Sequence, residues 1–382
     1  MATRTTTDHG DVLLVGSIAR LDDDWTVEDV FRRSAAALGE HVTMLPDGEL
    51  GDRSQWITFI ARHTYYGHPD LETRSRHTYD DWLPKGYDDQ WRFAVREGVD
   101  EIRFERIGYA AEAERSYEIF KRLRDEGAIP EGMRFLVAYP LTESAVRAFV
   151  NEPRDYEIIW RAYNDAVRRE LEHLGTVIPP EDLAIQWDLA RETAMIEQVG
   201  FNFDDSELTS LPKDPMERYL EALSDLSPSV PDGAWLGLHV CYGSLQHKEG
   251  ESPDSAHYTP IRDLGTAVEM LNRGVVACGR RVDFVHMPVQ LADKRDGHYA
   301  PLDRLEVGDA RVYLGLLDVS DGLEGALERV EIARRHLDDF GVGTPCGWGR
   351  RPASESIEDL LALNAEVATI FVRRMRPTYS PR

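Results

Sequence analysis

The sequence predicts an α/β protein built as a single (β/α)₈ barrel with loop excursions on its C-terminal face. Short apolar runs alternate with amphipathic stretches, which is typical of βαβ units around a parallel sheet. The length of 382 residues suits one decorated barrel or two average domains. Because no repeat, low-complexity stretch or Gly/Ser linker divides the chain, one domain is favoured. We expect the barrel over residues 11–376, a flexible segment over 1–10 and a tail over 377–382.

Nine short apolar runs are strand candidates, one more than a barrel needs. The first is Asp11–Ala19, with the sequence DVLLVGSIA. The other eight are, in chain order, His41–Leu45, Glu101–Arg106, Phe135–Tyr139, Ala184–Trp187, Leu236–Cys241, Phe284–Val289, Val312–Leu317 and Gly343–Trp348.

Helical patterns fill most of the intervals between these strands. The first expected helix covers Val27–Leu38, where Thr26 and Asp29 have the spacing of a capping box. The segment Gly67–Gln90 is polar, aromatic-rich and aperiodic, so we expect it to be an excursion over one face of the domain. Further helices are predicted where apolar residues recur at helical spacing, at Trp56–Tyr66, Tyr156–Leu174, Leu323–Leu337 and Ile357–Met375.

The charge balance argues against two classes of partner. There are 44 basic and 69 acidic residues, which give a net charge of −25. Such a field repels a phosphate backbone and an anionic membrane surface, so we expect neither nucleic-acid nor membrane binding. No apolar run approaches the roughly eighteen residues that span a bilayer. Because Met1–Gly10 is polar and unlike a signal peptide, the sequence predicts a cytoplasmic protein.

The strongest chemical signal is a histidine and a cysteine two residues apart. His239 and Cys241 end the buried run WLGLHV, and this spacing on a strand places both side chains on one face. A thiolate and a neutral imidazole are natural zinc ligands, and Cys346 in TPCGW follows another strand candidate. Alternatively, Cys241 and Cys346 are small core residues, as many unpaired cysteines are. Cys278, near a helix end, fits that second interpretation.

Several motifs resemble one family in its own order along the chain. LHVCYGS and, far downstream, GTPCGWGRR resemble the two cysteine motifs of cobalamin-independent methionine synthase. VGSIAR, PDGELGDR, AIQWD and YLGLLDVSDGLEGALERVEIAR resemble its other motifs, so the resemblance runs from Leu13 to Arg351. It places the chain near the catalytic domain of that enzyme. The wider superfamily includes uroporphyrinogen decarboxylase and zinc-dependent epoxyalkane:coenzyme M transferase.

The resemblance implies a zinc-dependent transferase that activates a thiol for alkyl (methyl) transfer, or that runs the reverse dealkylation. Its substrates would be a small thiol or amino-acid-like molecule and an alkyl donor. The implied zinc ligands are His239, Cys241 and Cys346. The residues implied to grip the amino-acid-like part of the substrate are Gly16, Ser17, Glu49 and Asp188.

The sequence also departs from the family pattern. The family's glutamate ligand has no counterpart in VDFVHMPVQ, where His286 is the nearest residue able to bind a metal. Ser320 stands in place of a histidine in the family's acid motif, and Leu189 in place of a second acid beside Asp188. There is no room for the duplicated N-terminal barrel. We therefore do not expect methionine synthesis itself.

Each candidate residue also has a plainer interpretation. Ser17 could start a turn, and Glu49 could be a solvated acid in a loop between glycines. Asp188 ends an apolar strand, where an unpartnered charge is costly, so a functional role is favoured. His286 could be a hydrogen-bonded core histidine, a ligand or an acid/base. His247, in the loop after Cys241, could contact substrate or simply lie on the surface.

Two other functions remain open. The first is a metal-independent lyase or decarboxylase, resembling uroporphyrinogen decarboxylase, in which Asp188, Glu49 and His286 transfer protons. The second is a barrel that binds a metabolite without catalysis, for which Leu189 and Ser320 at the family's acid positions are the best support. The sequence neither requires nor forbids a homodimer.

Overall fold

The computed structural model describes residues 10–20, 23–75, 91–197, 214–242, 261–349 and 355–375. The predicted flexible segment, apart from Gly10, and the predicted tail lie outside these ranges, as does His247. In the described part of the chain, every helix is too short or too polar to cross a membrane.

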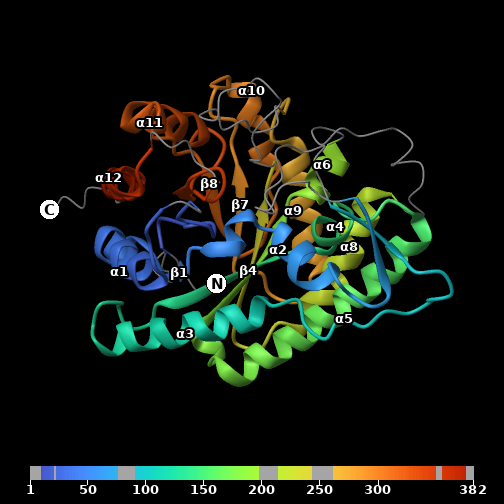
Figure 1. The fold of residues 1–382 in the computed structure, drawn as a ribbon. Helices are drawn as coiled ribbons and strands as arrows, with labels where there is room; N and C mark the ends of the chain where they lie inside the picture. Colours follow the sequence, from blue (N-terminus) through green and yellow to red (C-terminus); the bar gives the residue numbers. More distant parts are fainter. Residues whose placement is uncertain are drawn as a thin grey trace, which may run out of the picture.

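A curled parallel sheet forms the centre of the molecule (Figure 1). It has seven strands in the order β1-β4-β5-β6-β7-β8-β9, and every neighbouring pair is parallel. The strands are β1 Met44–Pro46, β4 Arg134–Pro140, β5 Leu183–Leu189, β6 Trp235–Val240, β7 Phe284–Pro288, β8 Arg311–Gly315 and β9 Gly341–Gly343.

The complete eight-stranded barrel was predicted from the alternating pattern, and the structure bears it out in part. Asp11–Ala19 lies between the two edge strands but forms only isolated parallel bridges, Val12 with Val342 of β9 and Ser17 with Gly48. Its backbone N–H groups reach His41 and Gly48 on the β1 side, which lie outside the three residues of β1. No continuous ladder therefore forms there.

The main helices surround the sheet, and most of them contact the next one along the chain. The contacts run from α1 to α3, α5, α8 and α9, and α12 contacts both α11 and α1. Their bounds are α1 Val27–Leu38, α3 Tyr109–Asp125, α5 Pro153–Val177, α8 Pro215–Leu226, α9 Gly265–Ala277, α11 Gly322–Ala333 and α12 Ile357–Met375. Shorter helices are α2 Thr58–Ile60, α4 Thr142–Val146, α6 Arg191–Glu197 and α10 Asp296–Tyr299.

Local signals explain where several helices begin and end. In α1 the Thr26 hydroxyl accepts the Asp29 N–H, and the Asp29 carboxylate accepts the Thr26 N–H, so the predicted capping box is present. The predicted helix at Trp56–Tyr66 is α2 followed by a π-helical turn at Ala61–Tyr65.

Two strand predictions need correction, and the predicted excursion contains a strand. Glu101–Arg106 forms no strand: Ile102 and Phe104 are buried, but the segment has no ladder partner. The predicted excursion at Gly67–Gln90 contains β2 (Leu71–Ser75), which pairs antiparallel with β3 (Arg92–Val95). The last strand was expected at Gly343–Trp348, but β9 ends at Gly343, just before the Thr344-Pro345 turn. Proline has no backbone N–H to donate to a ladder.

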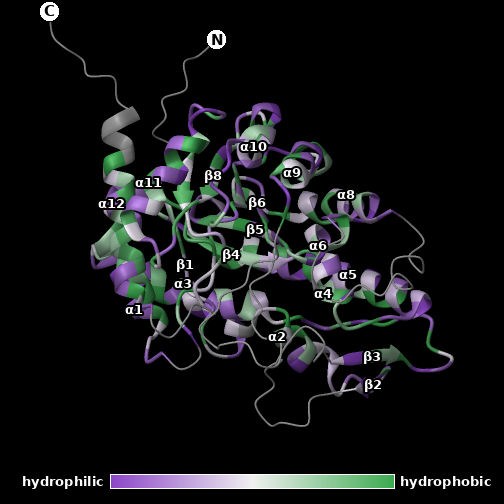
Figure 2. Ribbon diagram, turned by 90° about the horizontal axis from the view of Figure 1, so that it is seen from above, coloured by the Kyte–Doolittle hydropathy of each residue, from purple (hydrophilic) through white to green (hydrophobic). Residues whose placement is uncertain are grey.

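The core has two layers, and Figure 2 shows the central strands β4 to β6 as predominantly hydrophobic. The larger layer lies between sheet and helices. A smaller cluster fills the inside of the curled sheet and consists of Leu13, Met44, Leu136, Ala184, Phe284 and Tyr313. Gly237 makes room for this cluster, because a Cβ there would lie 2.1 Å from the Phe284 ring. Beyond this apolar plug, toward the carboxyl ends of the strands, the inward-facing side chains become polar.

Candidate metal centre

A row of polar side chains crosses the inner face of the sheet near the carboxyl ends of its strands. Asp188 on β5 is in register with His239 on β6, which is in register with His286 on β7. Residues in register on parallel neighbours share a face, and alternation places these three on the same side as Ala184 and Phe284. All three side chains therefore face the inside of the curled sheet, where they are buried.

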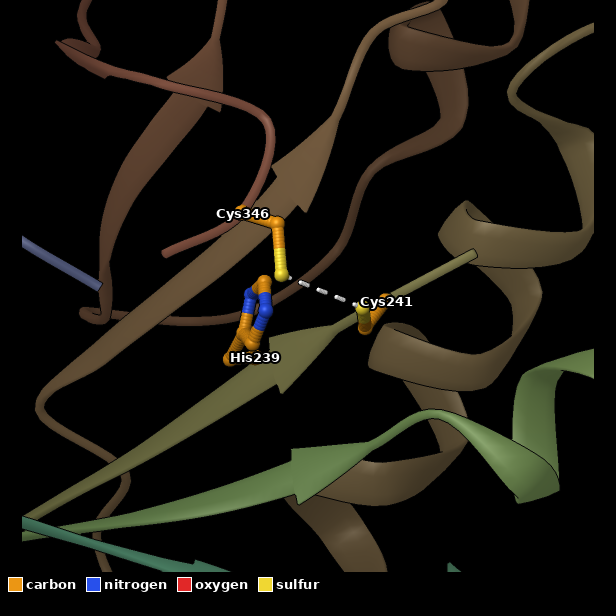
Figure 3. A group of neighbouring side chains, drawn as sticks. All are labelled: His239, Cys241 and Cys346. Carbon is orange, nitrogen blue, oxygen red and sulfur yellow. Dashed lines mark hydrogen bonds between the residues drawn. The ribbon is translucent and has the colours of Figure 1, made fainter. Parts of the chain in front are cut away.

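Three predicted ligands meet there (Figure 3). His239, Cys241 and Cys346 each offer one ligand atom, and these atoms lie within 4.8 Å of one another. The two Sγ atoms are 3.5 Å apart. His239 and Cys241 come from β6 and its end, while Cys346 comes from the loop after β9. The convergence of an imidazole on both sulfurs favours the ligand interpretation, although the two cysteines also pack with Ala190 in a small apolar cluster, as core residues would.

The loop that carries Cys346 is held by side chains on both sides. The Thr344 hydroxyl donates to the Cys346 carbonyl at 2.7 Å, and the Trp348 indole N–H donates to Thr344 Oγ1 at 2.6 Å. Ser17 accepts from the next turn, through its carbonyl from Trp348 N at 2.7 Å and through its hydroxyl from Gly349 N at 3.2 Å. Ser17 thus fixes the Cys346 loop, a role that the sequence did not suggest.

His286 forms a close pair with His239. Their Nδ1 atoms are 2.7 Å apart, and the ring planes are inclined at 46°. Burial lowers the pKa of His286 well below its usual value, and His239 lowers it further, while the Thr344 backbone acts in the opposite direction. His286 is therefore neutral at physiological pH. Among the described residues, neither His239 Nε2 nor His286 Nε2 has a hydrogen-bond partner.

Two carboxylates lie beside this cluster. Burial raises the pKa of Asp188 well above its usual value, and the negative charges of Glu49 and Cys346 raise it further. The Gln186 amide acts in the opposite direction by donating to Asp188 Oδ1 at 2.8 Å. Gln186 also donates to the Val15 carbonyl at 2.7 Å, which joins β5 to the first segment of the chain. Asp188 is thus a buried acid that keeps its proton more readily than an ordinary aspartate.

The loop that carries Glu49 is strained and firmly anchored. Glu49 has a positive φ of 51°, which is costly for a residue with a side chain. Asp47 holds the turn by accepting from Glu49 N at 3.0 Å, Arg53 Nη2 at 2.7 Å and Ser116 Oγ at 2.7 Å. A Cβ on Gly16 would lie 3.1 Å from Glu49 Oε1, so glycine there lets the carboxylate approach the backbone.

Two residues of the site were missed by the sequence analysis. Trp56 packs against Ala190, Cys241 and Cys346, and its buried indole N–H has no hydrogen-bond partner among the described residues. It also has a positive φ of 49°, so a second strained residue lies at the site. Gln186 could have been found, because it lies two residues before Asp188 on the same strand and so shares its face.

The remaining predicted residues lie elsewhere. Cys278 belongs to the main core, as expected, and burial raises its pKa to about 11. Asp318 accepts a hydrogen bond from Ser320 N at 2.8 Å in an exposed turn. His247 lies outside the described residues, so its predicted contact with substrate has no structural test.

The donor set fits a zinc ion. Two thiols and an imidazole are typical zinc ligands, and three protein ligands leave a fourth position open in tetrahedral coordination. His239 Nε2 is a buried nitrogen without a partner among the described residues, which is a costly arrangement unless something binds it. The described residues therefore provide the atoms that such a metal requires.

Comparison with solved structures places this fold in a known class. No known family profile matches the sequence, and no curated protein is detectably similar to it. The fold is similar to that of a B12-independent methionine synthase from Shewanella sp. W3-18-1 solved with selenomethionine, with a TM-score of 0.60, 13% identity, and coverage of 96% of this chain and 98% of that one. At this identity the likeness concerns the fold, and to that extent it confirms the predicted resemblance. A methyltransferase from Methanosarcina mazei also matches, over 94% of each chain at 10% identity, but its TM-score of 0.48 is too low to support an argument.

Proposed function

We propose that this protein is a zinc-dependent transferase that moves an alkyl group, most simply methyl, to a thiol or removes it in the reverse reaction. The observation that carries the proposal is the convergence of His239, Cys241 and Cys346 from separate elements into one buried cluster. A zinc ion held there would keep an incoming thiol deprotonated, and so nucleophilic, at neutral pH.

The fold supports an amino-acid-like substrate. The Shewanella methionine synthase was solved with selenomethionine, an amino acid that carries a methyl group on selenium. In this chain we assign Gly16, Ser17, Glu49 and Asp188 to the grip on the amino-acid part. Glu49 and Asp188 are close enough for their charges to interact, and a cationic ammonium group between them would relieve their repulsion.

The proton-handling residues proposed for the site are Asp188, Glu49 and His286. The raised pKa of Asp188 means that it keeps a proton more readily than an ordinary aspartate, as a general acid must. His286 is neutral and buried, so it can accept or donate at its ring nitrogens. Ser320 and Leu189 occupy the family's other acid positions, so we infer an alkyl donor other than methyltetrahydrofolate.

We also infer that residues 11–376 work as one domain in which Asp11–Ala19 takes the place of the eighth barrel strand. Its bridges to β9 and to Gly48 on either side support this. We further propose a cytoplasmic location, where the cysteines would stay reduced and available to a metal.

Metal analysis of untagged protein tests the proposal. We expect a single zinc ion per chain in the natural protein, and its loss in Cys241→Ser and in Cys346→Ser. Cys278→Ser is the control, because Cys278 is also buried but lies in the main core, and this variant should retain the metal. Natural protein that is well folded but metal-free would contradict the proposal and favour a metal-independent lyase that uses Asp188, Glu49 and His286.

A further inference from the structure

The hydrogen bond between His239 and His286 constrains which ring nitrogen of His239 can bind a metal. The two Nδ1 atoms are 2.7 Å apart, so one must carry a hydrogen and the other a lone pair. A neutral imidazole has one nitrogen of each kind. The arrangement of protons in one ring therefore fixes the arrangement in the other.

The open nitrogen of His239 decides between the two arrangements. Its Nδ1 lies 2.7 Å from Nδ1 of His286, whereas its Nε2 has no hydrogen-bond partner among the described residues. Nε2 is therefore the nitrogen that remains for a metal, which needs its lone pair. A neutral imidazole with its lone pair on Nε2 carries its hydrogen on Nδ1, and this leaves Nδ1 of His286 as the acceptor.

We infer that His286 is a positioning residue that accepts the Nδ1–H of His239 and thereby presents His239 Nε2 to the metal. This inference rests on the proposed zinc site and specifies how it is oriented. Metal-binding histidines usually donate their other N–H to a carboxylate, a carbonyl group or water. In this protein a second, neutral imidazole takes that place, because β6 and β7 bring the two histidines into register.

His286 lies between the two segments that supply the proposed metal ligands. It pairs with His239 of β6 on one side, and on the other its Nε2 faces β9, 3.8 Å from the place that a Cβ on Gly343 would take. The residue after Gly343, Thr344, donates to the Cys346 carbonyl at 2.7 Å. His286 therefore packs between β6 and the strand that leads into the Cys346 loop.

Direct coordination by His286 is the competing arrangement. His286 is not among the residues whose ligand atoms lie within 4.8 Å of one another. Coordination through its Nδ1 would also remove the hydrogen bond to His239, since that nitrogen's lone pair cannot serve both. The geometry thus favours an indirect role.

Two variants of His286 separate these roles. In His286→Asn the amide oxygen can still accept the hydrogen of His239, whereas His286→Leu cannot. We expect the leucine variant to bind zinc about 10–100-fold more weakly in competition with a chromogenic chelator, and the asparagine variant to recover most of the affinity. His298→Asn, at another buried histidine whose charge partner is Asp293, controls for loss of a buried imidazole and should bind as the natural protein does.

A spectroscopic measurement tests the tautomer directly. In protein labelled with ¹⁵N-histidine and loaded with ¹¹³Cd, we expect metal coupling to Nε2 of a single histidine, His239, with a hydrogen on its Nδ1. Coupling to two histidines, coupling to Nδ1, or equal zinc affinity of the leucine variant and the natural protein would overturn the inference. Failure of the proposed function differs from all three, because the natural protein would then bind no zinc or bind it independently of Cys241 and Cys346.

Discussion

Two buried polar groups in this molecule differ in how completely their hydrogen bonds are satisfied. On α5, the Glu170 carboxylate accepts from Ile107 N at 2.8 Å, Gly108 N at 2.6 Å and Ala110 N at 2.9 Å. The Tyr139 hydroxyl adds a longer hydrogen bond at 3.3 Å. In the candidate metal centre and beside it, by contrast, Nε2 of His239 and Nε2 of His286 have no hydrogen-bond partner in the part of the chain that the structure describes.

The difference separates a structural role from a functional one. The bonds to Glu170 satisfy N–H groups at the start of α3 and just before it, where Gly108 provides no capping side chain. Buried polar groups without partners cost stability, and they persist where a ligand completes them. Saturation at Glu170 therefore indicates a structural brace, whereas the open nitrogen of His239 supports the proposed metal site.

The largest effect on the free energy of unfolding is expected from removing the Glu170 carboxylate. Glu170→Ala leaves three backbone N–H groups without their acceptor, and we expect the free energy of unfolding to fall by about 4 kcal/mol. Urea unfolding measures this. Glu172→Ala is the matched control, because Glu172 is an exposed acid on the same helix and should change stability by less than about 0.5 kcal/mol. Equal losses in the two variants would contradict a structural role for Glu170.

An intermediate effect is expected at Glu192, a buried acid that accepts from Ser144 Oγ at 2.5 Å. Burial raises its pKa from 4.5 to about 7. The folded protein therefore keeps this proton while the unfolded chain loses it, so stability falls as pH rises from about 4.5 to 7.

Glu192→Gln removes that dependence, because an amide does not ionise. We expect the variant to be more stable than the natural protein by up to about 3 kcal/mol above pH 7, with the difference vanishing below about pH 4.5. Urea unfolding over this pH range is the measurement. A constant difference across the range would show that the titration of Glu192 is not its cause.

The smallest effect on the free energy of unfolding is expected in the candidate metal centre. His239→Leu, measured in the presence of a chelator, should change the free energy of unfolding by less than about 1 kcal/mol. The lost hydrogen bond to His286 is offset by removal of a buried nitrogen without a partner among the described residues. A loss of several kcal/mol would mean that His239 is a structural brace like Glu170. It would contradict the distinction drawn between the two residues.

Local and periodic signals predicted much of the fold. The bounds of α1 and α12 agree with the expected helices, because apolar spacing and, for α1, a capping box mark them in the sequence. Strands β4 to β8 were found as apolar runs. The pairing of β2 with β3 was not, because the polar β2 has no apolar alternation to mark it. The ladder expected at Asp11–Ala19 is reduced to isolated bridges because β1 has only three residues. No local pattern indicates that β1 is so short.

The site was predictable where it depended on strand spacing or on family motifs. Spacing placed His239 and Cys241 together, and the motifs added Cys346. The contact between His239 and His286 depends on the register of β6 with β7, which a single sequence does not reveal. Trp56 reaches the sulfurs from a strained turn inside a segment that seemed helical, so nothing in its sequence context marked it.

The distance along the chain between the two cysteines has a consequence for biosynthesis. Cys241 and Cys346 are 105 residues apart, and the loop with Cys346 is also held by Ser17, 332 residues before its partner Gly349. A ribosome adds about 5–20 residues per second, so β6 is made several seconds before the last ligand exists. Until then only two of the three proposed ligands, His239 and Cys241, are present. Capture of the proposed zinc ion would therefore be a late event that follows closure of the chain.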